Sequence, residues 1–215
     1  MSSDPQTAAP VSAYTRVETQ SLPGQVKLKY HLVFLIAVVA VCLLFLMIST
    51  GTSQLRVTSF YGVKGEYTFW VSKNTAGGVT VTVSSIDGAC ATHRGLLLGG
   101  GAFSIIGIFA LMASLATGIL EFLEKPLPAK HMAAFAAAGA CFCAFLCWVF
   151  IAVLYNVPVC GLGIAFKSYG VYGPGFGLMV TVWLFLAGAV SVYMLRVNGT
   201  LPALQPAKAA SAGDL

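Results

Sequence analysis

The chain has 215 residues, of which 58% are hydrophobic and only 9% are charged, whereas charged residues make up about 25% of soluble domains. The formal net charge is +5, and the 12 Lys and Arg residues are spread along the chain without forming a cluster. This composition argues against a soluble globular protein and against a nucleic-acid-binding domain. It predicts an integral membrane protein whose partners include the lipid bilayer and whose cations lie near lipid head groups.

The first 29 residues are mostly polar and contain Pro5, Pro10 and Pro23. Such a composition cannot bury enough apolar surface to fold, so residues 1–29 are predicted to be a disordered N-terminal segment. No cleavable signal peptide is expected there, and the first apolar run would direct membrane insertion itself.

Four long apolar runs follow, and none of them contains Asp, Glu, Lys or Arg. They are Leu32–Ser49, Gly95–Leu120, Met132–Tyr155 and Val171–Leu195. About 18 or more such residues suffice to cross the hydrocarbon core as a helix. Because lipid leaves no partner for exposed backbone groups, each run must be helical. Residues 30–195 are therefore predicted to form an all-α membrane four-helix bundle.

The positions of the cations predict the orientation. Four spans place both ends of the chain, the loop 121–131 and the tail 196–215 on one side, which carries seven of the Lys and Arg residues against five on the other. Lys27 and Lys29 directly precede the first span, so cytosolic termini are expected, in the plasma membrane or an endomembrane. The glycosylation sequon at Asn198 would then lie on the cytosolic side and stay unmodified.

The outer loop 51–93 is large enough to fold on its own and has β character. Strands are predicted over 54–61, 67–71 and 78–84, with a turn over 74–78 in which two glycines supply positive φ. The fold class is thus a four-helix bundle with a small extracellular antiparallel sheet. The aromatic residues of this loop either pack against the bundle or form a surface for a partner: Phe60, Tyr61, Tyr67, Phe69 and Trp70.

The six cysteines fall into two groups. Cys90 ends the first outer loop and Cys160 lies in the second, 156–170, so an oxidising exterior would permit a disulfide between them. The other four lie inside spans and are interpreted as small packing residues. The histidines at the membrane edges, His31, His93 and His131, do not converge in the sequence, and no metal site is predicted.

Small residues recur at four-residue spacing within the spans. Such positions let helix backbones approach closely, either within the bundle or between copies of the chain. The predicted packing positions are Ala110, Ser114 and Gly118 in the second span and Gly173 and Gly177 in the fourth.

Motifs of enzymes and cofactor proteins are missing from the chain. There is no phosphate loop, dinucleotide fingerprint or pair of catalytic carboxylates, so neither catalytic residues nor a cofactor is expected. Transporters and proton relays place ionisable residues inside the membrane, and the spans contain none with a formal charge. A channel or transporter is therefore the least favoured reading.

One stretch of the outer loop resembles the signature of the amastins, four-span surface proteins of kinetoplastid parasites. Ser59, Phe60, Gly62, Lys64 and Glu66 match that signature, and Tyr61 keeps an aromatic where Trp or Phe is usual. The two cysteines that flank the signature in the family are replaced by Val57 and Tyr67. The beginning of the last span, around Tyr172, and the layout of loops over residues 30–195 are also similar to the family. The family is in turn similar in architecture to claudins and peripheral myelin protein, so the resemblance implies a claudin-like fold.

The resemblance implies a non-enzymatic surface or endomembrane protein that organises membrane or mediates adhesion through its outer loop. Ser59, Phe60, Tyr61, Gly62, Lys64 and Glu66 would form the contact motif, with Gly62 and Gly65 permitting a turn and Lys64 and Glu66 forming a pair or facing a partner. The alternative is an accessory subunit of a larger membrane complex, in which the small-residue ridges contact other membrane proteins.

Overall fold

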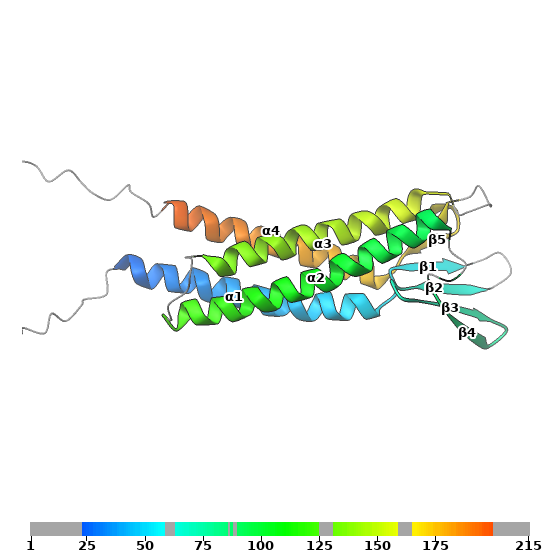
Figure 1. Cartoon of the computed structure of the whole chain (residues 1–215), viewed down its shortest axis with the longest axis horizontal. Coiled ribbons are helices and arrows are strands. Elements are labelled where there is room, and N and C mark those ends of the chain that lie inside the picture. The colour runs from blue at the N-terminus through cyan, green and yellow to red at the C-terminus, as the bar shows by residue number, and fades with distance from the viewer. Residues whose placement is uncertain are drawn as a thin grey trace, which may run out of the picture.

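A computed structural model describes residues 23–58, 63–85, 87, 90–124, 131–158 and 165–199. In these residues four long helices lie lengthwise beside one another: α1 (Pro23–Gly51), α2 (Ala91–Phe122), α3 (Met132–Asn156) and α4 (Pro174–Gly199) (Figure 1). Each contains a segment long and apolar enough to cross a membrane. A small sheet lies at one end, the sheet end, and α1 begins and α4 finishes at the other, the terminal end (Figure 1). The predicted four-helix bundle with a small antiparallel sheet is confirmed.

Buried positions recur at alternating spacings of three and four residues in each of the four helices. In α2 they are His93, Leu97, Gly100, Ser104, Gly107, Leu111, Ser114 and Gly118. In α3 they are Ala133, Ala137, Ala140, Ala144, Cys147, Ile151 and Leu154. An average period of 3.5 residues keeps one seam of each helix facing its neighbours in a left-handed bundle.

The seam between α2 and α3 is built mainly from small residues. Lipid tails are as apolar as Leu, so helices in a bilayer associate through close packing and hydrogen bonds rather than through the hydrophobic effect. Ser114 Oγ donates a 2.7 Å hydrogen bond to the Ala133 carbonyl of α3. A Cβ on Gly107 would lie only 3.3 Å from the Leu46 side chain of α1, so the glycine lets α1 and α2 approach closely. These contacts let three helices meet closely around α2.

The sheet contains five antiparallel strands in the order β4-β3-β2-β1-β5. The strands are β1 (Leu55–Thr58), β2 (Lys64–Tyr67), β3 (Val71–Ala76), β4 (Val79–Ser84) and β5 (Gly170–Tyr172). The predicted strand 67–71 is wrong, because residues 68–70 connect β2 to β3. Thr68 Oγ1 accepts hydrogen bonds from the backbone N–H groups of Trp70 and Val71, which closes this connection. The predicted turn 74–78 shrinks to Gly77 and Gly78, whose φ angles are 57° and 83°.

The strand β5 was missed, since residues from Val171 on were predicted to belong to the fourth span. Val171 instead pairs with Arg56 of β1, and the helix α4 begins only at Pro174. A proline at the first helical position loses no intrahelical hydrogen bond, so the chain changes from strand to helix there. The sheet thus joins the two loops of the sheet end into one unit.

Two glycines of α2 let the sheet dock on the helix. Phe69 is 1% exposed, and a Cβ on Gly100 would lie 2.6 Å from its ring. A Cβ on Gly101 would lie 2.7 Å from the Trp70 ring. Real Cβ contacts do not come this close, so any larger residue would push the aromatic rings away. Of the two alternatives for these aromatics, packing against the bundle is the one observed for Phe69, whereas Trp70 contacts α2 and stays 38% exposed.

We predict that Gly100→Ala lowers the thermal unfolding midpoint of the purified protein. Alanine gains about 1 kcal/mol of helix propensity over glycine, but the overlap with Phe69 costs about 1–3 kcal/mol. Gly95→Ala is the matched control, because nothing lies within 4 Å of a Cβ there. That variant should unfold at the wild-type temperature or above. Equal midpoints for the two variants would contradict this docking contact.

Candidate functional site at the sheet end

The sheet has two chemically different faces. The strand registers place Leu55, Tyr67, Ser72 and Val83 on one face, the apolar face, together with the other valines of β4. The opposite face, the charged face, carries Arg56, Lys64, Glu66 and Lys73. The apolar face is covered by the bundle near β1 and β2 and becomes exposed toward β4. The sheet end therefore offers a covered recess and an open edge.

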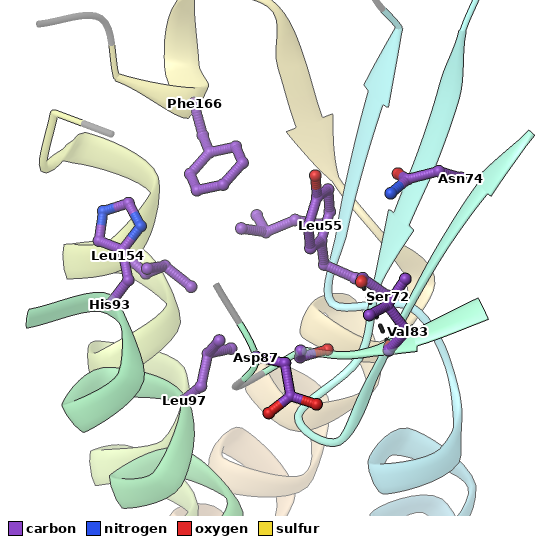
Figure 2. A pocket seen from close by; sticks show the side chains of 11 residues that line it. Leu55, Ser72, Asn74, Val83, Asp87, His93, Leu97, Leu154 and Phe166 are labelled. Carbon is purple, nitrogen blue, oxygen red and sulfur yellow. Dashed lines mark hydrogen bonds between the residues drawn. The ribbon is translucent and has the colours of Figure 1, made fainter. Parts of the chain in front are cut away.

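The recess is a cavity of about 290 Å³ between the apolar face and the ends of α2 and α3. Figure 2 shows His93, Leu97 and Leu154 on the helix side and Ser72, Asn74 and Val83 on the sheet side. Phe166, from the short 3-10 helix η1 (Phe166–Ser168), closes the top of this view. The remaining lining residues are Leu55, Tyr67, Ser85 and Asp87. The cavity is lined mainly by apolar side chains with a few polar groups, as ligand sites usually are.

His93 is an unusual member of this lining. It is 5% exposed, its ring stacks on Phe166 at a centroid distance of 5.7 Å, and a ring N–H donates a hydrogen bond to the Pro158 backbone carbonyl. Among the residues that the structure describes, its Nε2 has no hydrogen-bond partner. Leaving a buried polar atom unpaired costs about 1–3 kcal/mol. The cavity thus contains a ring nitrogen, His93 Nε2, that is available for a hydrogen bond with a ligand.

Tyr67 lies on the sheet side of the same cavity. Its ring meets Phe166 edge-on at a centroid distance of 5.5 Å, and burial raises the pKa of its phenol above the usual value. The hydroxyl therefore stays protonated at physiological pH and neutral in charge.

The charged face carries one ion pair. Arg56 Nε lies 3.2 Å from Glu66 Oε1, and both side chains are about half exposed. The expected pairing of Lys64 with Glu66 is not observed. Both residues lie on β2, and the residue directly opposite Glu66 on the neighbouring strand β1 is Arg56. Exposed pairs of this kind contribute at most about 1 kcal/mol. Their role is to set the charge pattern of this face.

Only part of the predicted contact motif lies in the described residues. Ser59, Phe60, Tyr61 and Gly62 lie outside them, whereas Lys64 and Glu66 belong to β2. Gly65 lies inside the strand rather than in a turn, and a Cβ there would lie 3.0 Å from Asn74 Oδ1. The expected turn at Gly65 is therefore wrong, and that glycine instead makes room for the neighbouring strand.

The cysteines separate as their positions suggested. Cys42, Cys141, Cys143 and Cys147 are free thiols within the helices, and Cys147 Sγ donates to the Gly100 carbonyl at 3.3 Å. Cys90 is disulfide-bonded. Cys160 lies outside the described residues, so its pairing with Cys90 stays a prediction.

The predicted packing positions lie in different environments. Ser114 and Gly118 lie in the buried seam of α2, and Ala110 is half-buried beside it. Gly173 is buried, but it precedes α4 and meets the backbone of the segment after α1. Gly177 is exposed on the outside of the bundle with open space around its Cα, so it does not pack within the bundle, and a contact with another copy of the chain stays a prediction.

Two histidines take part in separate side-chain clusters at opposite ends of the molecule. Besides His93 in the cavity, His131 at the terminal end lies 2.9 Å from the Tyr193 hydroxyl and 4.0 Å from a carboxylate oxygen of Glu121. The second cluster ties α2, α3 and α4 together. The burial of His93 could have been predicted from the sequence, because His93 lies four residues before Leu97 and thus continues the buried positions of α2 by one turn. The second cluster depends on long-range packing and leaves no sequence signal.

The four apolar helices with a sheet at one end define a multi-pass membrane protein of the four-span class. The sequence model of the Amastin surface glycoprotein family matches residues 27–192, and the chain belongs to that family. A comparison with curated proteins finds no match.

We predict that Gly173→Ala destabilises the sheet end whereas Gly177→Ala does not. The Gly173 N–H donates to the Gln54 carbonyl at 2.8 Å, and a Cβ on Gly173 would overlap the Ser53 carbonyl oxygen. The backbone there cannot yield without breaking the junction of α1, β1 and α4. Limited proteolysis at the sheet end should become at least several-fold faster in Gly173→Ala, and stay at the wild-type rate in Gly177→Ala. Equal protection in the two variants would contradict the junction described here.

Proposed function

We propose that this protein is a non-catalytic surface protein that holds two membranes in contact by pairing its sheet with that of a second copy. The observation that carries this proposal is the edge strand β4, which among the described strands pairs only with β3 and consists of alternating Val and Thr followed by Ser84. Val79, Val81 and Val83 are 67%, 55% and 41% exposed.

An open edge of this kind invites strand addition. Unpaired backbone groups along an edge are a template for another strand, and soluble proteins usually block such edges with Lys, Pro or a bulge. The strand from Val79 to Ser84 contains no charged residue and no proline. The other edge, β5, is only three residues long. Strand addition is therefore favoured at β4.

A second copy fits this edge because its sequence is self-complementary. Residues 79–83 read Val-Thr-Val-Thr-Val in both directions. Antiparallel pairing about Val81 would place Val79 opposite Val83 of the other copy and Thr80 opposite Thr82. All valines would then share one face and all threonines the other, as side-chain alternation requires. Such a contact is isologous and closes as a dimer.

The direction of β4 determines which membranes the two copies occupy. The β3–β4 hairpin extends away from the bundle and has Gly77 and Gly78 at its far end (Figure 1). Two antiparallel β4 strands would therefore have their bundles on opposite sides of the contact. This geometry supports contact between opposing membranes rather than between neighbours in one membrane.

The contact would be weak for a single pair and strong for an array. Six partly exposed valines supply on the order of a few hundred Å² of interface, below the roughly 1,200 Å² of stable complexes. Many copies on two facing membranes act together, and their avidity exceeds that of a single pair by a large factor.

Contact between cells requires the sheet end to face outward. Lys27 and Lys29 lie in the first turns of α1, directly ahead of its apolar segment, and favour cytosolic termini. The disulfide bond of Cys90 supports the same orientation, because disulfides persist in oxidising compartments.

We predict that proteoliposomes containing the protein cluster, and that Val81→Lys reduces the clustering rate at least tenfold. A charge at the centre of the paired edges would meet the same charge on the other copy. Val171→Lys is the matched control, since Val171 is an equally exposed valine on the opposite edge of the sheet. Its clustering should equal that of the wild type.

Clustering that survives Val81→Lys would contradict pairing at β4. Absence of wild-type clustering, together with stoichiometric partner proteins co-purifying in mild detergent, would replace the proposal with the accessory-subunit function.

The orientation can be tested with glycosylation. Gly78→Asn creates an acceptor site ahead of Val79 and Thr80, at a positive-φ position that asparagine tolerates. In cells, this variant should gain a glycan that peptide N-glycosidase removes, while the wild-type chain with its sequon at Asn198 should gain none. A glycan on the wild type that Asn198→Gln abolishes would reverse the orientation.

A further inference from the structure

We propose that the cavity beneath the sheet binds a neutral single-chain amphiphile, with its chain against the leucines and a hydroxyl head group on His93. This ligand site goes beyond the pairing of β4. It rests on three separate observations: the volume of the cavity, the composition of its walls and the unpaired nitrogen within it.

The volume limits the size of the ligand. An apolar cavity of about 150 Å³ holds a benzene ring. By the same scale, a cavity of about 290 Å³ accepts a chain of roughly ten carbon atoms. A single saturated chain of this length fits, whereas a two-chain phospholipid would leave most of its volume outside.

The walls are apolar and already in place. Leu55 of β1, Leu97 of α2 and Leu154 of α3 are each less than a tenth exposed, and Phe166 adds its ring from η1 (Figure 2). Four different elements therefore support the walls. A ligand would meet a preformed surface, so little ordering would oppose its binding.

The polar groups select the head group. His93 Nε2 is buried and has no partner among the described residues. Because the other ring nitrogen donates to the Pro158 carbonyl, Nε2 of the neutral ring is an acceptor and needs a donor. Among the described lining residues, the only formal charge belongs to Asp87, which disfavours an anionic head group. A hydroxyl group supplies the donor, whereas an ionised carboxylate can only accept. A neutral alcohol satisfies the site better than a carboxylate does.

The position of the cavity explains how such a ligand would reach it. The helix α2 has 32 residues, which is about 48 Å and some 18 Å more than the hydrocarbon core. Its first turns, with His93 and Leu97, therefore lie near the membrane boundary or beyond it. Single-chain amphiphiles concentrate at this boundary, so the bilayer itself would supply the ligand.

Photolabelling can test the site. The protein in lipid nanodiscs is treated with decanol carrying a diazirine, and the labelled peptides are mapped by mass spectrometry. We expect labelling at the sheet-end turns of α2 and α3, and unlabelled decanol should compete at least tenfold better than decanoate. Leu97→Trp fills the cavity and should reduce this labelling at least tenfold. Leu98→Trp, a neighbouring exposed position on α2, is the matched control and should label normally.

A second variant separates binding from folding. His93→Leu removes the unpaired Nε2 together with the hydrogen bond to the Pro158 carbonyl. Its thermal midpoint is therefore measured beside the labelling, and the folded variant should still be labelled on the same peptides while its preference for decanol over decanoate falls at least several-fold. Labelling that is equal in wild type and Leu97→Trp would overturn the site, and stronger competition by decanoate would overturn the hydroxyl assignment. Vesicle clustering by Leu97→Trp is measured in parallel, because unchanged clustering with lost labelling shows that the two proposals are independent.

Discussion

The close approach of the sheet to the glycines of α2 is the contact on which the rest of the structure depends. Inside a bilayer, helices gain nothing from excluding water, so they must touch closely to associate. The α2 seam satisfies this with Gly100, Gly107 and Gly118 among its buried positions. At its sheet end the same seam accepts Phe69, and the neighbouring Gly101 accepts Trp70. One helix surface therefore packs the bundle and anchors the sheet.

This anchoring makes the sheet a rigid extension of the membrane domain. The second attachment is the junction between the end of α1 and the start of α4. There the Gly173 N–H donates a hydrogen bond to the Gln54 carbonyl, and Ser49 Oγ donates to the Gly175 carbonyl at 2.8 Å. Together the two attachments hold β1 and β5 against the helix ends. The cavity lies beneath this fixed part, and β4 extends beyond it as an open edge. Recess and edge thus both follow from where the docking contacts are.

The sequence predicts the features that depend on local composition. Four uncharged runs determine the spans, and Gly77 and Gly78 determine the hairpin turn, because hydrophobicity and positive φ are properties of short segments. It misses β5, since the pairing of Val171 with Arg56 joins residues far apart in the chain. It does not say whether Gly177 packs inside the bundle, because four-residue spacing defines a stripe along a helix without saying which side faces the bundle; the structure places Gly177 on the outside. The lack of a hydrogen-bond partner for His93 Nε2 among the described residues likewise results from tertiary packing, so the sequence does not predict it.

The central claim is that the sheet and the bundle form one rigid body. Pulsed electron paramagnetic resonance between spin labels at Gly95 of α2 and Thr82 of β4 measures this most directly, since both positions are exposed. The structure predicts a single narrow distance distribution for the protein in nanodiscs. A broad distribution, with the sheet moving independently of α2, would contradict the account.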